Sequence, residues 1–107
     1  MIKIISPFLT TMLGIRGISL YPFIIIKFSD KVLINHESIH IRQQKELFVF
    51  KFYYLYLKEY LTLKKRYKSH YLAYRNISFE REAFENESNL NYLKSRPKNN
   101  WKKYKIT

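Results

Sequence analysis

Two histidines and a glutamate, His36, Glu37 and His40, form the sequence pattern with the clearest chemistry, H-E-x-x-H. Residues four apart on a helix lie on the same face, so the two imidazoles can bind a single metal ion. Glu37 then lies beside them, where its carboxylate can accept a proton from a water that attacks a carbonyl carbon. A catalytic zinc generally has three protein ligands, so the pattern also predicts a third ligand from another part of the chain.

The third ligand must be a histidine or a carboxylate, because the chain contains no cysteine. The acidic segment SFEREAFEN, residues 78–86, predicts a helix that can pack across the motif helix. Glu80 and Glu82 are two residues apart, or about 200° around a helix, so at most one of them can face the metal. The remaining histidine, His70, is interpreted as an ordinary surface residue. The spacing leaves both glutamates as candidates.

The chain before the motif predicts a short β element. Residues 1–13 are apolar but show no signal-peptide cleavage site, so we interpret them as mature protein. Residues 18–28 (ISLYPFIIIKF) are rich in β-branched and aromatic side chains and predict a strand or hairpin. Pro22 cannot donate to a ladder, which predicts an edge strand or a break at that position. The pair Ser29-Asp30 then provides an N-cap for a helix over residues 31–46.

From Leu47 to Leu63 the sequence is apolar around nearly the whole circumference of a helix. Such a helix is buried in a core or lies against a membrane. Lys51, Lys58 and Glu59 interrupt a run that is already shorter than the roughly twenty uninterrupted apolar residues of a bilayer span. A core helix is therefore the favoured interpretation, and contact with a membrane surface is the alternative.

A further helix is predicted from Tyr71 to Leu93, with Asn76 or Ser78 as its N-cap. Lys94 to Thr107 is basic and predicts a loosely ordered tail or a short last helix. We therefore predict one small α+β, mainly α domain over residues 1–93, with one short strand or hairpin and three to four helices. A basic C-terminal tail follows over residues 94–107.

The net charge of +12 arises from 20 basic and 8 acidic residues. It allows nucleic acid or an anionic membrane as a partner, bound through Lys64–Lys68 and the tail. We favour a peptide or protein substrate over nucleic acid. The amino-acid usage, rich in Lys, Ile, Asn, Tyr and Phe, is explained as well by the base composition of the genome as by a nucleic-acid partner. The absence of cysteine fits a cytoplasmic protein, with peripheral contact to the inner membrane as an alternative. The oligomeric state is left open.

The two motifs together resemble the gluzincin class of zinc metallopeptidases, in which H-E-x-x-H on one helix is joined by a glutamate on a downstream helix. Residues 80–86 (EREAFEN) look like the E-x-E-A-D or E-x-x-A-N element of the HtpX-like and ImmA/IrrE-like branches. The extension H-E-x-x-H-x-x-Q, from His36 to Gln43, is similar to that of small uncharacterised bacterial proteins with an E-R-E-A segment. The chain departs from the family at Phe84, where an Asp or Asn usually steadies a ligand histidine.

The resemblance implies a metallopeptidase-like core that holds Zn²⁺. Aligned on Ala83, the family pattern makes His36, His40 and Glu80 the ligands. If Asn86 is instead aligned with the polar residue that follows the ligand by four positions, the family pattern makes Glu82 the third ligand.

The resemblance further implies that Glu37 is the general base for hydrolysis of a peptide bond. Gln43 is predicted to line the cleft, and Tyr74 and Arg75 are candidate donors to the developing oxyanion. Two alternatives belong to other classes. One is a non-catalytic basic module that binds nucleic acid or an anionic membrane, and the other is a zinc-binding structural protein without turnover.

Overall fold

The computed structural model describes residues 1–106, and these residues form three β-strands and six α-helices. The elements in chain order are β1 (Ile2–Ile5), α1 (Pro7–Leu13), β2 (Gly17–Leu20), β3 (Phe23–Ile26), α2 (Lys31–Glu46), α3 (Phe50–Tyr67), α4 (His70–Asn76), α5 (Ser78–Asn86), α6 (Tyr92–Ser95) and a 3-10 helix, η1 (Asn100–Tyr104). The fold is α+β and mainly α, as predicted, with more strands and helices than expected.

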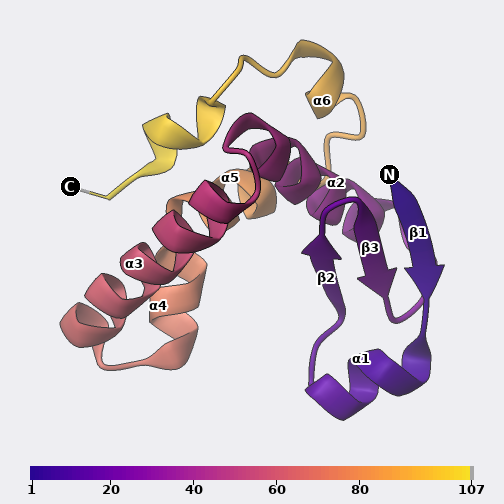
Figure 1. Cartoon of the computed structure of the whole chain (residues 1–107), viewed down its shortest axis with the longest axis horizontal. Helices are drawn as coiled ribbons and strands as arrows, with labels where there is room; N and C mark the ends of the chain where they lie inside the picture. Colours follow the sequence, from indigo (N-terminus) through magenta and orange to yellow (C-terminus); the bar gives the residue numbers. More distant parts are fainter. Residues whose placement is uncertain (107) are drawn as a thin grey trace.

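The three strands form a sheet in the order β1-β3-β2, with β1 parallel and β2 antiparallel to β3. The predicted strand at residues 18–28 is interrupted at Pro22, and its two halves form the β2–β3 hairpin. Strand β1 and helix α1 lie in residues 1–13, for which the sequence pattern predicts no element. Strand β2 is an edge of the sheet and lies next to α2 (Figure 1).

Helix α2 carries the H-E-x-x-H pattern and lies between two apolar clusters. It begins after Asp30, whose side chain accepts hydrogen bonds from backbone N–H groups of the first turn, as predicted. On one side, Leu33 and Ile41 pack against the isoleucines of β3. On the other side, Ile39 packs against α5 and α6. The motif helix is therefore held from both sides, and its polar face is left between them.

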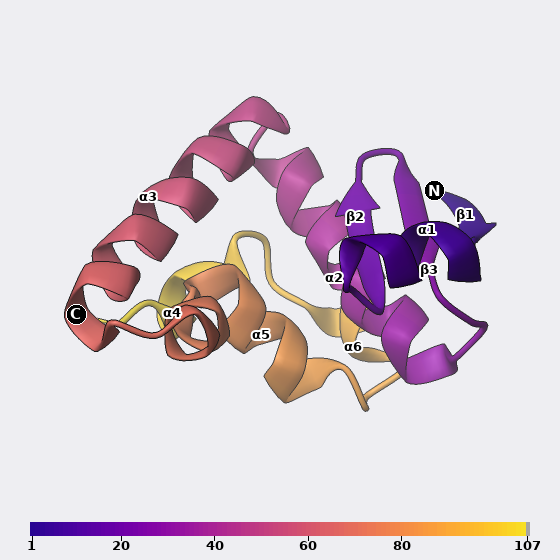
Figure 2. The ribbon, with the colours of Figure 1, turned by 90° about the horizontal axis from the view of Figure 1, so that it is seen from below.

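Helix α3 does not continue from α2. Phe48 and Val49 adopt left-handed φ angles of 55° and 60° and turn the chain, so the two helices meet as the arms of a V (Figure 2). The interpretation of Leu47–Leu63 as a core helix is only half right. Phe52 and Leu63 are buried, whereas the opposite face of α3 is exposed. None of the helices formed by residues 1–106 is both long and apolar enough to cross a membrane.

The prediction of a single helix from Tyr71 to Leu93 is wrong. The chain leaves the helical conformation at Ile77, with φ −60° and ψ 133°, and α4, α5 and α6 form separately. Glu59 of α3 accepts hydrogen bonds from the backbone N–H of Ser78 at 2.9 Å and from its Oγ at 2.7 Å. A carboxylate from another helix, rather than Asn76 or Ser78, therefore caps α5 at the positive end of its dipole.

The C-terminal segment is packed rather than loose. Arg96, Trp101 and Tyr104 are buried, and η1 lies against α5. Trp101 packs its ring on Phe79 of α5, with ring centroids 4.6 Å apart. The prediction of a loose tail is therefore wrong as far as residue 106, whereas the alternative of a short last helix matches η1. Thr107 lies outside the described residues.

Candidate metal centre

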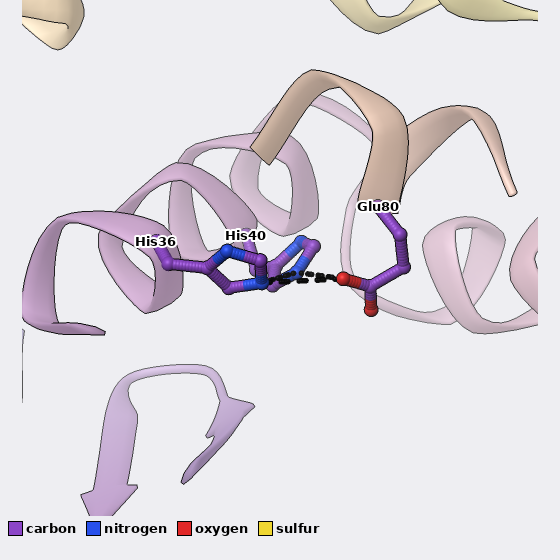
Figure 3. Close-up of side chains that lie close together, drawn as sticks. All are labelled: His36, His40 and Glu80. Carbon is purple, nitrogen blue, oxygen red and sulfur yellow. Dashed lines mark hydrogen bonds and ion pairs between the residues drawn. The ribbon is translucent and has the colours of Figure 1, made fainter. Parts of the chain in front are cut away.

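His36, His40 and Glu80 meet between α2 and α5 (Figure 3). The two imidazoles lie on one face of α2, and Glu80 reaches them from the first turn of α5. The Nε2 atoms of the histidines are 3.2 Å apart, and Oε1 of Glu80 lies 3.2 Å from Nε2 of His36 and 3.0 Å from Nε2 of His40. All three side chains are buried, and together they could hold a metal ion.

The spacing of these three atoms matches a zinc site. Donor atoms that bind one zinc ion at roughly 2.0–2.1 Å in tetrahedral directions are about 3.3 Å apart. The observed separations of 3.0 Å and 3.2 Å are close to that value. A common centre at ligand distance from all three therefore needs only small movements of the side chains.

Burial and charge shift the pKa values of His40 and Glu80 in opposite directions. Burial alone would lower the pKa of His40, but the charge and hydrogen bond of Glu80 outweigh it and raise the pKa to about 9. Burial alone would raise the pKa of Glu80, whereas its interactions with His40 and His36 hold that pKa well below the usual range. Glu80 is therefore ionised, as a metal ligand must be, and His40 releases a proton when it binds a metal.

Gln43 fixes the orientation of the His40 imidazole through its Nδ1 atom, on the opposite side of the ring from Glu80. Its Nε2 donates to the backbone oxygen of Phe79 at 3.1 Å and to Glu82 at 2.9 Å. Its Oε1 therefore faces Nδ1 of His40, at 2.8 Å, and Nδ1 must carry the proton that forms this bond. Nε2 is left as the ligating nitrogen. Gln43 is completely buried and is not among the residues that line the cavity, so the prediction that it lines the cleft is wrong.

Glu82, the alternative third ligand, points away from the histidine pair. Its carboxylate accepts hydrogen bonds from Nε of Arg96, the hydroxyl of Tyr92 and the amide of Gln43. Burial alone would raise the pKa of Glu82, but the hydrogen bonds from Arg96 and Tyr92 lower it. The assignment of Glu82 as a ligand is therefore wrong, because this carboxylate is committed to a buried ion pair with Arg96.

His36 has a carboxylate partner of its own. Oε1 of Glu87 lies 2.9 Å from Nδ1 of His36, so the support that the family pattern places at position 84 comes from a residue three positions later. Phe84 instead packs its ring against the imidazole, with centroids 4.6 Å apart. Arg75 is exposed and lies over the ring of Phe84, 3.8 Å from its centroid. Its predicted role as an oxyanion donor is therefore not supported.

Two tyrosines lie close to Glu80. The hydroxyl of Tyr56 donates to Oε2 of Glu80 at 2.7 Å and so leaves Oε1 to face the imidazoles. Tyr74, a candidate oxyanion donor from the sequence, lines the cavity next to the site. Burial, and then the negative charge of Glu80, raises the pKa of both phenols above the usual range. Both hydroxyls therefore remain protonated donors at neutral pH.

The candidate base, Glu37, is buried and is held by the edge strand β2. Oγ of Ser19 lies 2.6 Å from Oε1 of Glu37 and 2.8 Å from its backbone oxygen. Gly17 leaves room for the other carboxylate oxygen, because a Cβ atom at that position would lie 3.2 Å from Oε2. A side chain at position 17 would therefore crowd the second oxygen of Glu37 and displace it by a few tenths of an ångström.

A cavity of about 530 Å³ opens onto the histidines, Glu37 and Glu80. One wall is formed by residues 14–20, and the other contains aromatic residues of α3 and α4. Gln44 lines the cavity and joins α2 to β2. It donates to the backbone oxygen of Ser19 at 3.0 Å and accepts from the backbone N–H of Tyr21 at 2.8 Å.

Four supporting residues were not assigned from the sequence, namely Ser19, Tyr56, Glu59 and Glu87. Glu87 directly follows the acidic segment of residues 78–86 and falls about two helical turns after Glu80, which is a usable signal. Ser19 and Tyr56 give no such signal. Their contacts with Glu37 and Glu80 span 18 and 24 residues of sequence, and nothing in the local pattern distinguishes them.

No family model, curated protein or solved structure matches the chain. The interpretation of the site therefore depends on the geometry and chemistry of its own residues.

Proposed function

We propose that the protein is a zinc-dependent peptidase in which His36, His40 and Glu80 hold the metal and Glu37 is the general base. The strongest support is the convergence of two Nε2 atoms and Oε1 of Glu80 to within 3.2 Å of one another, with Glu37 in the same cavity. Two imidazoles and a carboxylate are a ligand set typical of catalytic zinc. When bound, the ion supplies a Lewis acid that polarises a carbonyl group and acidifies a water molecule.

Glu37 and Tyr74 supply the proton chemistry. Oε1 of Glu37 is held by Ser19, so Oε2, next to Gly17, accepts the proton of the attacking water and passes it to the leaving amine. Tyr74 is protonated at neutral pH, as phenols ordinarily are, and burial raises its pKa further. Its hydroxyl donates to the carbonyl oxygen of the substrate as negative charge develops there.

The cavity favours a peptide with a large apolar side chain. Its volume of about 530 Å³ falls within the roughly 300–1,000 Å³ of typical ligand pockets. Its lining combines the aliphatic residues Ile18 and Leu33 with the aromatic residues Phe52 and Phe84. An apolar side chain of the substrate would displace water from this lining.

The proposal is tested by zinc analysis and cleavage of quenched fluorogenic peptides, using the wild type, His36→Ala and Glu37→Gln. The wild type is expected to purify with equimolar zinc and to cleave peptides with a large apolar residue beside the scissile bond. His36→Ala is expected to lose both zinc and activity. Glu37→Gln is expected to keep zinc and lose activity by at least about a hundredfold, because only the proton acceptor is removed.

Glu85→Gln is the matched control, since Glu85 is an exposed carboxylate on α5. It should retain both zinc and activity. Full zinc retention by His36→Ala would refute the metal site, and wild-type activity in Glu37→Gln would refute the base. Stoichiometric zinc without hydrolysis of any peptide would instead indicate a metal-binding structural protein.

A further inference from the structure

Helix α3 exposes an apolar stripe along the face opposite its buried residues. Phe50, Tyr54, Leu57 and Leu61 recur at spacings of four, three and four residues, so they follow one line along the helix. Their exposed fractions lie between 57% and 85%, whereas Phe52 on the other face is 3% exposed. We call these four residues the α3 stripe. A continuous exposed apolar surface of this kind marks an interaction site.

Basic residues border the α3 stripe. Lys51, Lys58 and Lys65 recur every seven residues and are exposed, so they form a second line beside the stripe. Phe48 extends the apolar surface at the start of the helix and is 84% exposed. Its left-handed backbone conformation, with φ 55°, costs free energy, and the turn that contains it keeps this large ring in water.

We propose that the α3 stripe binds the surface of an anionic lipid bilayer. The stripe offers apolar side chains to the acyl boundary, and the adjacent line of lysines lies at the level of the negative headgroups. The net charge of +12 complements such a surface. This proposal does not depend on the proposed peptidase activity.

Two other occupants fit the charges and the apolar area less well. A second copy of the chain would bring two molecules of charge +12 together with their lysine lines side by side, which costs electrostatic free energy. A nucleic acid would neutralise the lysines, but its phosphate backbone would leave Phe50, Leu57 and Leu61 without an apolar partner. A bilayer surface satisfies both the charges and the apolar stripe.

The test is co-sedimentation of the full chain with vesicles of phosphatidylcholine and phosphatidylglycerol, and with vesicles of phosphatidylcholine alone. The wild type is expected to bind only the anionic vesicles and to be released by salt. The double variant Leu57→Glu, Leu61→Glu should lose at least about tenfold in partitioning, since both apolar burial and attraction are removed. The matched control is Phe8→Glu, Met12→Glu on α1, a helix with exposed apolar residues and no basic residue.

The control variant makes the same change in net charge and should lose only a few-fold. Equal losses of vesicle binding in the two variants would overturn the proposal, because binding would then depend on charge alone. Dependence on charge alone is what a nucleic-acid site would show. Absence of vesicle binding by the wild type would also overturn it. A solution dimer that Leu57→Glu, Leu61→Glu dissociates would overturn it in favour of a second copy.

A fluorescent variant tests the same surface without adding charge. Trp101 is only 6% exposed and gives a constant background, whereas Phe50 is 85% exposed. The emission of Phe50→Trp is expected to shift to shorter wavelength when anionic vesicles are added. Phe8→Trp on α1 should show no shift, and an equal shift in both variants would contradict the assignment to the α3 stripe.

Discussion

Gln43 and Glu82, on helices α2 and α5, are joined by a hydrogen bond of 2.9 Å in which the amide donates to the carboxylate. Glu82 is paired with Arg96 and is ionised, so it can only accept hydrogen bonds. The amide nitrogen of Gln43 must therefore face Glu82, and the amide oxygen must face Nδ1 of His40. A carboxylate that touches neither a histidine nor the metal position thus acts with the backbone oxygen of Phe79 to determine which nitrogen of His40 is free to ligate.

Replacing Glu82 by Gln is expected to weaken zinc binding by about 10- to 100-fold. The neutral side chain can accept or donate, so only the backbone oxygen of Phe79 still requires the amide nitrogen of Gln43 on this side. Competition with a chromophoric chelator measures the affinity, and ¹⁵N chemical shifts of His40 report its tautomer. Glu85→Gln makes the same chemical change at an exposed position of α5 and should leave both unchanged. An unaltered affinity in Glu82→Gln would show that Gln43 is oriented by other contacts.

Removing the carboxylate of Glu87 should also weaken zinc binding by about 10- to 100-fold, because Nδ1 of His36 loses its partner at 2.9 Å. The change is Glu87→Ala, with Glu85→Ala as the control on the same helix. The same chelator competition gives the result. Equal affinities for the two variants would mean that packing of Phe84 on the imidazole is sufficient to hold His36.

Gly17→Ala is expected to reduce peptide hydrolysis by about tenfold while zinc content is unchanged, because misplacing a catalytic group costs rate without removing the metal. The added methyl group would lie 3.2 Å from Oε2 of Glu37, so the carboxylate must move. Gly14→Ala provides the contrast, since its Cβ meets open space but its φ is +70°. It should cost about 1 kcal/mol of stability and reduce hydrolysis less than Gly17→Ala does, because Gly14 lines the cavity but its Cβ would not contact Glu37. Equal activity of Gly17→Ala and wild type would argue against Oε2 as the proton acceptor.

The chelator-treated protein should lose stability as the pH rises from 6.5 to about 9. Interaction with Glu80 outweighs burial and raises the pKa of His40 from 6.5 to about 9, so the charged imidazole stabilises the folded state. This contribution, about 3 kcal/mol, is complete below the lower value and lost above the higher one. Zinc affinity should rise over the same interval, because the ion displaces a proton. Urea titrations with and without zinc test both statements, and a flat profile for the treated protein would contradict them.

The elements nearest the motif were predictable because local chemistry determines them. Asp30 caps α2, and Pro22 breaks the strand, through contacts within a few residues. The choice between Glu80 and Glu82 was not predictable from periodicity, because it depends on Arg96, which lies 14 residues beyond Glu82 and supplies the opposing charge.

The outer face of α3 and the C-terminal segment were misjudged for a related reason. The sequence of a helix that is apolar on all sides does not show which face packs against the rest of the protein. In α3 the face with Phe52 is buried, and the face with Leu57 is exposed. The segment after Lys94 is basic and looks like a solvated tail. Its packing depends on Trp101 and on a buried acid in α5, neither of which local composition can reveal.

Helix α5 presents Glu80 to the histidines and Glu82 to Arg96. The same short helix therefore supplies one of the three candidate metal ligands and the buried ion pair that holds the C-terminal segment. Zinc binding and packing of the C-terminal segment both need α5 folded in this position, so each stabilises the state that the other requires, and the linkage is reciprocal. Zinc should therefore slow tryptic cleavage after Lys98 and Lys102, and a C-terminal segment that is locked down should in turn retain the ion longer.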